Sequence, residues 1–388
     1  MVGGLRAKGG LIIRRHSVRA YAYTYDPVGR LLTATKDGTL VEEYRYNAVG
    51  TRTYEMNALR GITGRTMSYS AEDHLLSAGD TTYQYDVDGY LTNRTNGANQ
   101  TSYVYSSRGE LLRVNLPDGR VIEYVHDPFG RNIAKKVNGA IAEKYLWQGL
   151  TRLLAVYDGS NSLLMRFEYA DARMPVAMAK GGSTYYLTYD QVGSLRVVAD
   201  SSGSVVKRID YDSFGNIIND SSPAFAVPFG FAGGLHDRDT GLVRFGFRDY
   251  DPDVGRWLAK DPILFKAGNT DLYGYVLSNP ISWVDPLGLS VVGEAVVHGL
   301  VSAAITTAKV GGLIGGLTPI ALEAAAVAAG VIMFPEPLNA DEAWDLYEMR
   351  ELNPRLERED QLIAEIKAMM EPMERKLCAG NCTPCATR

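Results

Sequence analysis

Cysteine is scarce in this sequence, with three residues among 388, all close to the C-terminus. A framework of disulfides therefore cannot hold the body of the chain together. An excess of basic residues is also lacking, because the formal net charge at pH 7 is −5. Proteins that bind nucleic acid need a basic face to neutralise phosphates, so we expect no nucleic-acid partner.

A secretory signal is missing from the N-terminal segment, residues 1–19. Its sequence, MVGGLRAKGGLIIRRHSVR, is basic but contains no apolar run long enough for a signal peptide. We therefore expect the chain to remain in the cytoplasm until other machinery exports it or delivers it to the cell surface or beyond.

Tyrosine, in contrast, is abundant, with 24 Tyr against 10 Phe. Tyrosine combines a high strand propensity with a polar tip, which suits sheets that keep one face wet. The hydrophobic fraction of 46% is ordinary for a globular protein. The expected fold class is mainly β.

A repeat of about twenty residues occupies residues 20–230. The unit is Tyr-Asp-x-x-Gly-x-Leu, followed by polar residues and a second turn. Recognisable units begin at the following residues: Tyr25, Tyr46, Tyr69, Tyr85, Tyr105, His126, Tyr189 and Tyr211. Degenerate units near Tyr145 and Tyr169 are expected to fill the gap in the series. Such self-similarity is typical of repeat architectures.

Each unit has the residues of a β-hairpin. The Asp side chain can accept a hydrogen bond from an amide two residues on, and the glycine, as at Gly29, supplies a positive φ. A second turn is predicted at Asp37-Gly38, Asp118-Gly119 or Asn138-Gly139. Because one hairpin is marginally stable in water, neighbouring units should pair into a continuous sheet. We assign these Tyr and Asp residues a scaffold role.

Two further segments follow the repeats. One is RDYDPDVGRWLAKDPI from Arg248, and the other is NTDLYGYVLSNPISWVDPLGL ending at Leu289. Together with the repeats they resemble the RHS/YD-repeat family, which comprises bacterial RHS effectors, the C component of Tc toxins and animal teneurins. The resemblance covers residues 20–289. It implies a β-sheet that spirals into a hollow shell around a toxic C-terminal polypeptide, with residues 231–289 as the RHS-associated core, or plug. Family shells are longer, so we expect the last few turns of a shell.

The resemblance also implies that the core cuts its own backbone directly after DPxGL with paired aspartates. Carried onto this sequence, the two carboxylates are Asp261 and Asp285, and Arg248 is an accessory cation. The bond to be cut is Leu289–Ser290.

That chemistry is reasonable for these residue types. Peptide hydrolysis needs a base to activate water and an acid to protonate the leaving amine, and two close carboxylates that share one proton supply both. An arginine can orient a carboxylate or stabilise developing charge. Asp-Pro is also common in turns, so each aspartate alone could be structural. We interpret Asp249, Asp251 and Asp253 as turn-formers. The residues interpreted as plug core are Trp257, Trp283, Tyr273 and Tyr275.

The composition changes at Ser290, where the predicted variable cargo, residues 290–388, begins. Residues 291–334 are apolar and rich in Gly and Ala, and Gly311, Gly312, Gly315 and Gly316 have the spacing of closely packed helices. The uncharged runs are shorter than the twenty or so residues that span a membrane. A helical hairpin that contacts a membrane and a buried helical pair both remain open.

Residues 340–388 predict an acidic helical tail that ends with Cys378, Cys382 and Cys385. The spacing of the three Cys matches an iron–sulfur triplet, but the sequence lacks the large α/β pattern that such enzymes need, and a zinc site would need a fourth ligand. We expect a linker or a thiol pair there, and neither a metal nor a cofactor. No P-loop, zinc-hydrolase or Ser/His/Asp pattern appears in this tail, so its activity is unassigned.

Two hypotheses follow. In the first, the chain is the C-terminal part of an RHS-type polymorphic toxin, with a shell segment, a self-cleaving core and a cargo, used in competition between bacteria. Its partners would be its own cargo, a cognate immunity protein and secretion machinery. In the second, it is a YD-repeat scaffold or remnant without enzymatic activity.

Overall fold

The computed structural model describes residues 12–16, 19–170, 173–267, 270–289 and 291–293. The chain divides into two compact units, residues 1–323 and 324–388, and every described residue belongs to the first. The predicted tail helices and the Cys triplet therefore lie outside the described residues, as does any membrane contact of residues 294–334. The predicted boundaries between domains stay predictions.

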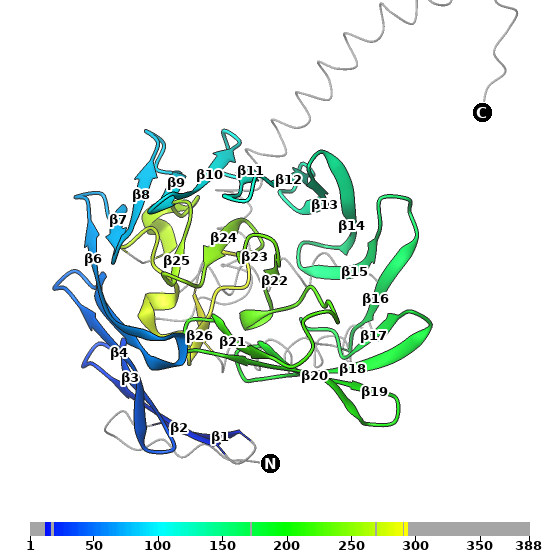
Figure 1. Ribbon diagram of the computed structural model, residues 1–388, viewed down its shortest axis with the longest axis horizontal. Helices are drawn as coiled ribbons and strands as arrows, with labels where there is room; N and C mark the ends of the chain where they lie inside the picture. Colours follow the sequence, from blue (N-terminus) through cyan, green and yellow to red (C-terminus); the bar gives the residue numbers. More distant parts are fainter. Residues whose placement is uncertain (1–11, 17–18, 171–172, 268–269, 290, 294–388) are drawn as a thin grey trace, which may run out of the picture. The chain divides into compact units, whose positions relative to one another are not determined.

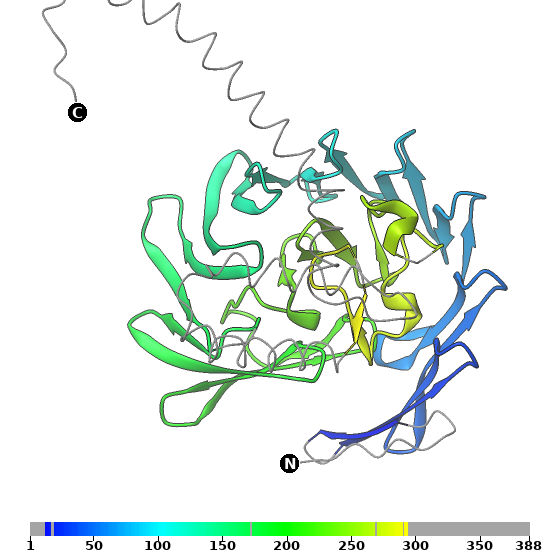
Figure 2. The same ribbon diagram turned by 180° about the vertical axis from the view of Figure 1, so that it is seen from behind.

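Strands β1–β21 form one antiparallel sheet, in which each strand pairs with the next along the chain. Their bounds are β1 (Ile12–His16), β2 (Arg19–Tyr25), β3 (Leu31–Lys36), β4 (Thr39–Tyr46), β5 (Arg52–Asn57), β6 (Ile62–Tyr69), β7 (Leu75–Ala78), β8 (Thr81–Tyr85), β9 (Leu91–Asn96), β10 (Asn99–Tyr105), β11 (Leu111–Asn115), β12 (Val121–His126), β13 (Asn132–Val137), β14 (Ala140–Gln148), β15 (Arg152–Tyr157), β16 (Leu163–Glu168), β17 (Ala177–Lys180), β18 (Ser183–Tyr189), β19 (Leu195–Asp200), β20 (Val205–Tyr211) and β21 (Ile217–Asp220). Figures 1 and 2 show the sheet curving round the segment that follows it. This confirms the expected mainly β class with a spiralling sheet.

The side chain of the second residue stabilises each YDxxG turn. In the first such turn, Asp26 Oδ1 accepts hydrogen bonds from the amides of Val28 at 3.1 Å and Arg30 at 2.9 Å. Gly29 has a φ of +94° and donates its amide to Asp26 O at 3.0 Å. The same pair of amide-to-side-chain bonds recurs at Asn47, Asp86, Asp127, Asp158, Asp190, Asp200 and Asp212. The predicted turn chemistry is confirmed.

A β-bulge precedes each of these turns. The pairing of β2 with β3 shifts register between Thr24 and Tyr25, where the strand enters the turn. The same shift occurs at Tyr46, Tyr69, Tyr85, Tyr105, His126, Tyr189 and Tyr211. A bulge bends its strand and increases the local twist, so bulges repeated along one edge account for the curvature of the sheet.

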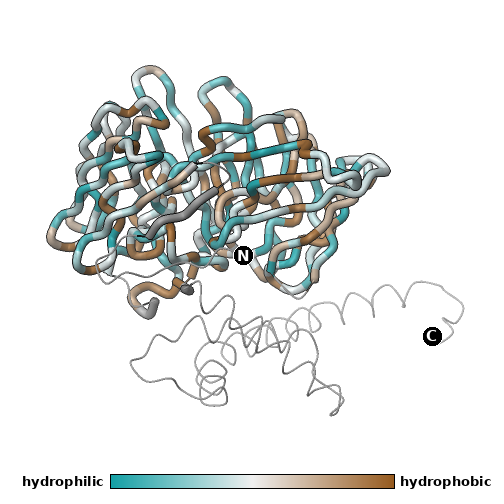
Figure 3. Tube along the Cα trace, turned by 90° about the horizontal axis from the view of Figure 1, so that it is seen from below, coloured by the Kyte–Doolittle hydropathy of each residue, from teal (hydrophilic) through white to brown (hydrophobic). Residues whose placement is uncertain are grey.

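The leucine and the tyrosine of the unit have separate structural roles. The leucine is buried at Leu31, Leu75, Leu91, Leu111 and Leu195. In some units the tyrosine hydroxyl donates to a carbonyl of the preceding hairpin: Tyr46 to Leu31 O at 2.7 Å, and Tyr69 to Arg52 O at 2.6 Å. Figure 3 shows hydrophobic and hydrophilic residues alternating along the strands, as a sheet with one buried face requires.

Two repeats depart from this pattern, and both departures place polar groups inside the sheet. Arg52 occupies the leucine position of one unit, and its residue is 6% exposed. In another unit, His126 replaces the tyrosine and Asn132 the leucine; both line a cavity of about 390 Å³ together with Arg244. His126 Nδ1, Asn132 Oδ1 and Arg244 Nε have no hydrogen-bond partner among the described residues. Burial lowers the pKa of His126 to about 3, so this histidine stays neutral. The cavity is polar enough to hold ordered water.

The plug contains short strands and 3₁₀ turns packed inside the curve of the sheet. Its strands are β22 (Leu235–His236), β23 (Val243–Phe245), β24 (Arg248–Asp251), β25 (Arg256–Trp257) and β26 (Trp283–Val284), and β27 (Val292–Gly293) follows the plug. Three 3₁₀ turns belong to the plug: η2 (Phe231–Gly233), η3 (Leu264–Ala267) and η4 (Val276–Ser278). A fourth, η1 (Ala58–Arg60), lies between β5 and β6 of the sheet. Buried ion pairs tie plug to sheet, as from Arg94 Nη1 to Asp251 Oδ2 at 3.1 Å and from Lys135 Nζ to Asp237 Oδ1 at 2.7 Å.

Aromatic residues form the centre of the plug. Tyr250 lies 4.5 Å from Tyr275 and 5.7 Å from Trp257 between ring centroids. Trp257, Tyr273 and Tyr275 are almost completely buried, and Trp283 packs partly buried against the same cluster. The assignment of these four residues to the core is confirmed.

The start of the predicted cargo is extended where helix was expected. β27 pairs with β26, with Val292 opposite Val284 and Gly293 opposite Trp283. The expectation of helix from residue 291 is therefore wrong for its first residues. Val291 and Val292 are β-branched, which favours the strand that the plug offers over a helix start. Within the described ranges, no helix has the length and apolar character needed to cross a membrane.

The hydroxyl bonds between hairpins predict a measurable contribution to stability. Tyr46→Phe removes the bond to Leu31 O and should lower the free energy of unfolding by about 1 kcal/mol, measured by denaturant titration. Tyr186→Phe is the matched control, because Tyr186 is 52% exposed. Equal effects of the two substitutions would contradict the role given to the buried hydroxyl.

Candidate functional site

Arg248 is the centre of the candidate site. It opens β24 and is buried, with 4% of its side chain exposed. One of its nitrogens, Nη2, lies 2.8 Å from Asp261 Oδ2 and 3.2 Å from Asp285 Oδ2. Two aspartates that are 24 residues apart in the sequence thus share a single guanidinium nitrogen.

Asp261 follows β25 and is held by the backbone. Its amide donates to Leu272 O at 3.0 Å, and its Oδ1 accepts the amide of Ile263 at 3.0 Å. Burial raises the pKa of Asp261 to about 6, although Arg248 opposes that effect, and the nearby charge of Asp285 adds to it. A carboxyl group of this kind can hold a proton near neutral pH.

Asp285 organises the end of the DPLGL segment. Its residue is 2% exposed, and its Oδ1 accepts the amide of Leu289 at 2.9 Å. The amide of Gly288 donates to Asp285 O at 3.3 Å, which closes a tight turn. The carboxylate therefore reaches the residue that precedes the predicted cut.

The backbone of this segment is clamped against the β23–β24 hairpin. Phe247 N donates to Leu287 O at 2.8 Å, and Arg248 Nε donates to Gly288 O. Gly246 and Gly288 have positive φ values of +48° and +67°. A Cβ on Gly288 would lie 2.7 Å from Phe245 O, so only glycine allows this approach.

The ring of Trp257 stacks against the guanidinium group of Arg248. The Arg248 guanidinium carbon lies 4.2 Å from the centroid of the Trp257 ring. Such stacking is favourable for a desolvated guanidinium and fixes the plane of its nitrogens. Burial lowers the pKa of Arg248, while Asp261 and Asp285 oppose that shift, so the group keeps its charge.

The structure brings together Arg248, Asp261, Asp285 and Leu289, the residues that the family resemblance selected, and their catalytic role stays a prediction. Ser290 lies outside the described residues. Of the three aspartates interpreted as turn-formers, Asp251 accepts the amide of Asp253 at 2.9 Å and fits that interpretation.

Asp249 and Asp253 do not fit the turn-former interpretation. Asp249 is buried and pairs with Arg244 at 2.6 Å, and Asp253 pairs with Arg60 and Arg65. Both are ion-pair partners: Arg244 is the cross-strand neighbour of Asp249 in the β23–β24 hairpin, whereas Arg60 and Arg65 lie far from Asp253 in the sequence. Those arginines, and the stacking of Trp257, were not found from the sequence. One local feature of the sequence does indicate buried charge in this region: Arg52 stands at the position where the repeat has a buried leucine.

Metal chemistry has no evident site here. Within the described part of the chain, no three His, Cys, Asp or Glu side chains are grouped closely enough to hold a metal ion. The chemistry available to the candidate site is that of paired carboxylates beside a cation.

A curved YD-repeat sheet with a plug inside defines a shell protein, and the comparisons with known proteins agree. The protein-family model described as Teneurin YD-shell matches residues 11–281. The chain belongs to the RHS/YD-repeat family.

Relatives include an animal teneurin and a bacterial toxin. Teneurin-3 of Danio rerio is 32% identical over 277 residues, covering 68% of this chain and 10% of the teneurin. Double-stranded DNA deaminase toxin A of Burkholderia cenocepacia (strain H111) is 31% identical over 322 residues, covering 74% of this chain and 22% of the toxin. The chain thus spans a small part of each relative's length.

A solved structure gives a looser likeness. The crystal structure of TcdB2-TccC3-TEV has a TM-score of 0.40 and 17% identity, covering 72% of this chain and 18% of that one.

The clamp on DPLGL predicts unequal effects for two glycines. Gly241 also has a positive φ, +74°, but a Cβ there would meet no atom within 4 Å. Gly241→Ala should cost about 1 kcal/mol of stability from backbone strain alone. Gly288→Ala should cost clearly more, because the Cβ also displaces the hairpin. Denaturant titration of both variants measures the difference, and equal losses would contradict the clamp.

Proposed function

We propose that this protein is a shell segment of an RHS-type toxin whose plug cleaves its own backbone after Leu289. The observation that supports this proposal is the shared contact of Arg248 with Asp261 and Asp285 next to the DPLGL turn. The released C-terminal polypeptide would be the cargo, used in competition between bacteria. It would need export machinery and an immunity protein in the producing cell.

The proposed reaction is a single hydrolysis. One carboxylate removes a proton from water, and the water oxygen attacks the Leu289 carbonyl carbon. Arg248 stabilises the negative charge on the tetrahedral intermediate. The second carboxyl group gives its proton to the nitrogen of Ser290 as the peptide bond breaks. The products are a carboxylate at Leu289 and a free amine at Ser290.

A structural role is the second candidate function. An arginine between two buried aspartates is also a satisfied ion-pair network, and such networks occur in proteins without catalytic activity. In that case the plug would only close the sheet, and the chain would be a non-enzymatic YD-repeat scaffold.

Substitution of the aspartates separates the two functions. Purified full-length protein should run as two polypeptides on a denaturing gel, and Asp261→Asn or Asp285→Asn should leave one. Asp237→Asn is the control, since it removes a plug carboxylate that pairs with Lys135 away from the site. An intact wild-type chain would contradict the proposal. Loss of cleavage in Asp249→Asn but not in Asp285→Asn would contradict this choice of the pair.

The rate of cleavage should depend on pH. Because the pKa of Asp261 is raised to about 6, its proton is present below that pH and is lost above it. If Asp261 supplies the proton, cleavage should slow as the pH rises from 5.5 to 8. Protein made by cell-free synthesis and transferred to buffers across this range allows the rate to be followed on gels. A rate that increases with pH would contradict the acid role of Asp261.

A further inference from the structure

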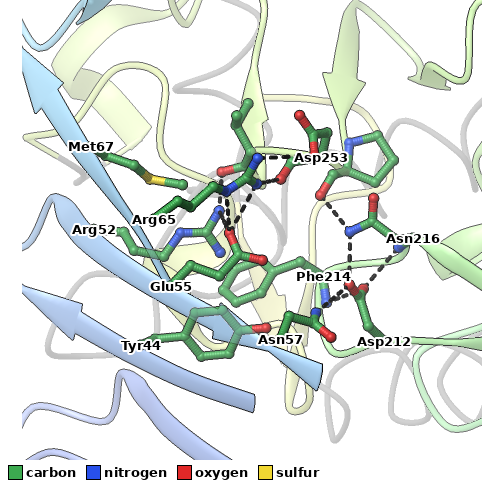
Figure 4. Close-up of polar contacts among 12 residues, drawn as sticks. Tyr44, Arg52, Glu55, Asn57, Arg65, Met67, Asp212, Phe214, Asn216 and Asp253 are labelled. Carbon is green, nitrogen blue, oxygen red and sulfur yellow. Dashed lines mark hydrogen bonds and ion pairs between the residues drawn. The ribbon is translucent and has the colours of Figure 1, made fainter. Parts of the chain in front are cut away.

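A cluster of buried charges joins three segments that are distant in the sequence. We call it the seam cluster; its members are Glu42, Arg52, Glu55, Arg60, Arg65, Asp212 and Asp253. They come from β4 to β6, from the loop between β20 and β21, and from the turn between β24 and β25. Figure 4 shows how several of them converge.

Direct contacts connect the three segments. Asn57 Nδ2 donates to Asp212 Oδ2 at 2.9 Å across 155 residues, and Asn216 Nδ2 donates to Pro252 O at 2.7 Å. Arg65 Nη1 lies 3.2 Å from Asp253 Oδ1. The cluster therefore holds the early hairpins, the last hairpin and the plug together.

The seam cluster is one positive charge short. It contains four carboxylates and three guanidinium groups, and most of these side chains are buried. Asp251 lies nearby but is balanced by Arg94. Burying an unbalanced negative charge is costly, so such a group tends to take up a proton.

Glu42 is the carboxylate without a cation. Glu55 lies 3.0 Å from Arg60 Nη1 and 2.9 Å from Arg65 Nη2. Asp253 contacts the same two arginines. Among the described residues, no cation lies within ion-pair distance of Glu42. Its oxygens accept the Tyr44 hydroxyl at 2.7 Å and the amide of Ser213 at 3.2 and 3.3 Å.

Asp212 is better placed to keep a negative charge. Its two oxygens accept four N–H groups: the amides of Phe214 and Asn216, and the side-chain amides of Asn57 and Asn216. Arg60 Nε lies 3.9 Å away. Burial raises the pKa of Asp212 to about 6, yet these donors favour its ionised form over that of Glu42.

The surroundings of Glu42 favour its protonated form on balance, although hydrogen bonds from Ser213 and Tyr44 oppose the rise in its pKa. The charged or titratable groups packed around it are Tyr44 on its own strand, Arg52 and Glu55 on β5, Arg60 on η1 and Asp212 on the facing loop. Burial first, and then Asp212, raises the pKa of Glu42 to about 7.

We propose that Glu42 holds a proton in the folded protein, and that loss of this proton in mildly alkaline solution loosens the seam between β4–β5 and the β20–β21 loop. The proton completes the charge balance of the seam cluster. When it leaves, two adjacent buried carboxylates repel each other across the seam. The shell is therefore held more firmly at pH 5.5 than at pH 8.5.

The direction of the pH effect follows from linkage. The folded protein binds the proton of Glu42 more tightly than the unfolded chain does, because the folded pKa is raised. The stabilisation is complete below the unfolded value of about 4.5 and is lost as the pH rises through about 7. Low pH strengthens this seam.

Glu42→Gln tests the proposal in the full-length protein. Glutamine keeps the shape of the protonated side chain and cannot ionise. The variant should match the wild type in melting temperature at pH 5.5 and exceed it by a few degrees at pH 8.5. Glu43→Gln is the control on the same strand, since Glu43 pairs with the exposed Arg45, and it should follow the wild-type pH dependence.

A localised measurement accompanies the melting curves. At pH 8.5, hydrogen–deuterium exchange in residues 209–217 should be slower in Glu42→Gln than in the wild type, with no difference in residues 153–187. The proposal would be overturned if Glu42→Gln lost the same stability relative to the wild type at every pH. It would also be overturned if exchange in residues 209–217 did not differ between the variant and the wild type at pH 8.5.

Asp212→Asn keeps the test open if Glu42→Gln does not fold. Removing the charge of Asp212 balances the cluster with Glu42 ionised. The variant should therefore be less stable at all pH values, because it loses an acceptor, but its decline between pH 6 and 8.5 should be flatter than that of the wild type. An unchanged or steeper decline would overturn the proposal.

Discussion

Each YDxxG turn combines hydrogen bonds from an Asx side chain with a β-bulge, and this combination gives the sheet its curvature. Its Asx hydrogen bonds set the turn locally, and its bulge bends every strand that enters it. Repetition along one edge makes a sheet that curves and acquires an inner face. The Tyr46 and Tyr69 hydroxyls then tie their hairpins to the preceding ones. A local turn thus creates the interior in which the plug is packed.

An interior built from tyrosines and paired charges has consequences for the plug. The plug is attached to the sheet by buried ion pairs such as Arg94–Asp251 and Lys135–Asp237, as well as by apolar packing. Buried pairs contribute little net stability, but breaking one partner leaves an uncompensated charge. They therefore set the position of the plug, and that position aligns Arg248 with Asp261 and Asp285. The seam cluster is likewise a set of buried charges between sheet and plug, but it has one positive charge fewer than it has carboxylates.

Local chemistry explains which features could be predicted from the sequence. The hairpins follow from Asp, Gly and alternating residues within a few positions, so the sheet was predictable. Asp261 and Asp285 follow from the family resemblance alone. They are 24 residues apart in the sequence, and no local pattern predicts that both contact Arg248. The contacts of Asp253 with Arg60 and Arg65 depend on how the curved sheet meets the plug, and no short sequence window contains that information. The strand at Val292 forms because β26 offers a partner edge, which composition alone does not reveal.

The proposed self-cleavage cuts the backbone directly after the DPLGL turn. The most direct measurement is the N-terminal residue of any C-terminal polypeptide in the purified wild-type protein, determined by mass spectrometry of the intact fragments. Cleavage of the Leu289–Ser290 bond predicts a new N-terminus at Ser290. A single uncut chain, or a fragment that begins at any other residue, would contradict it.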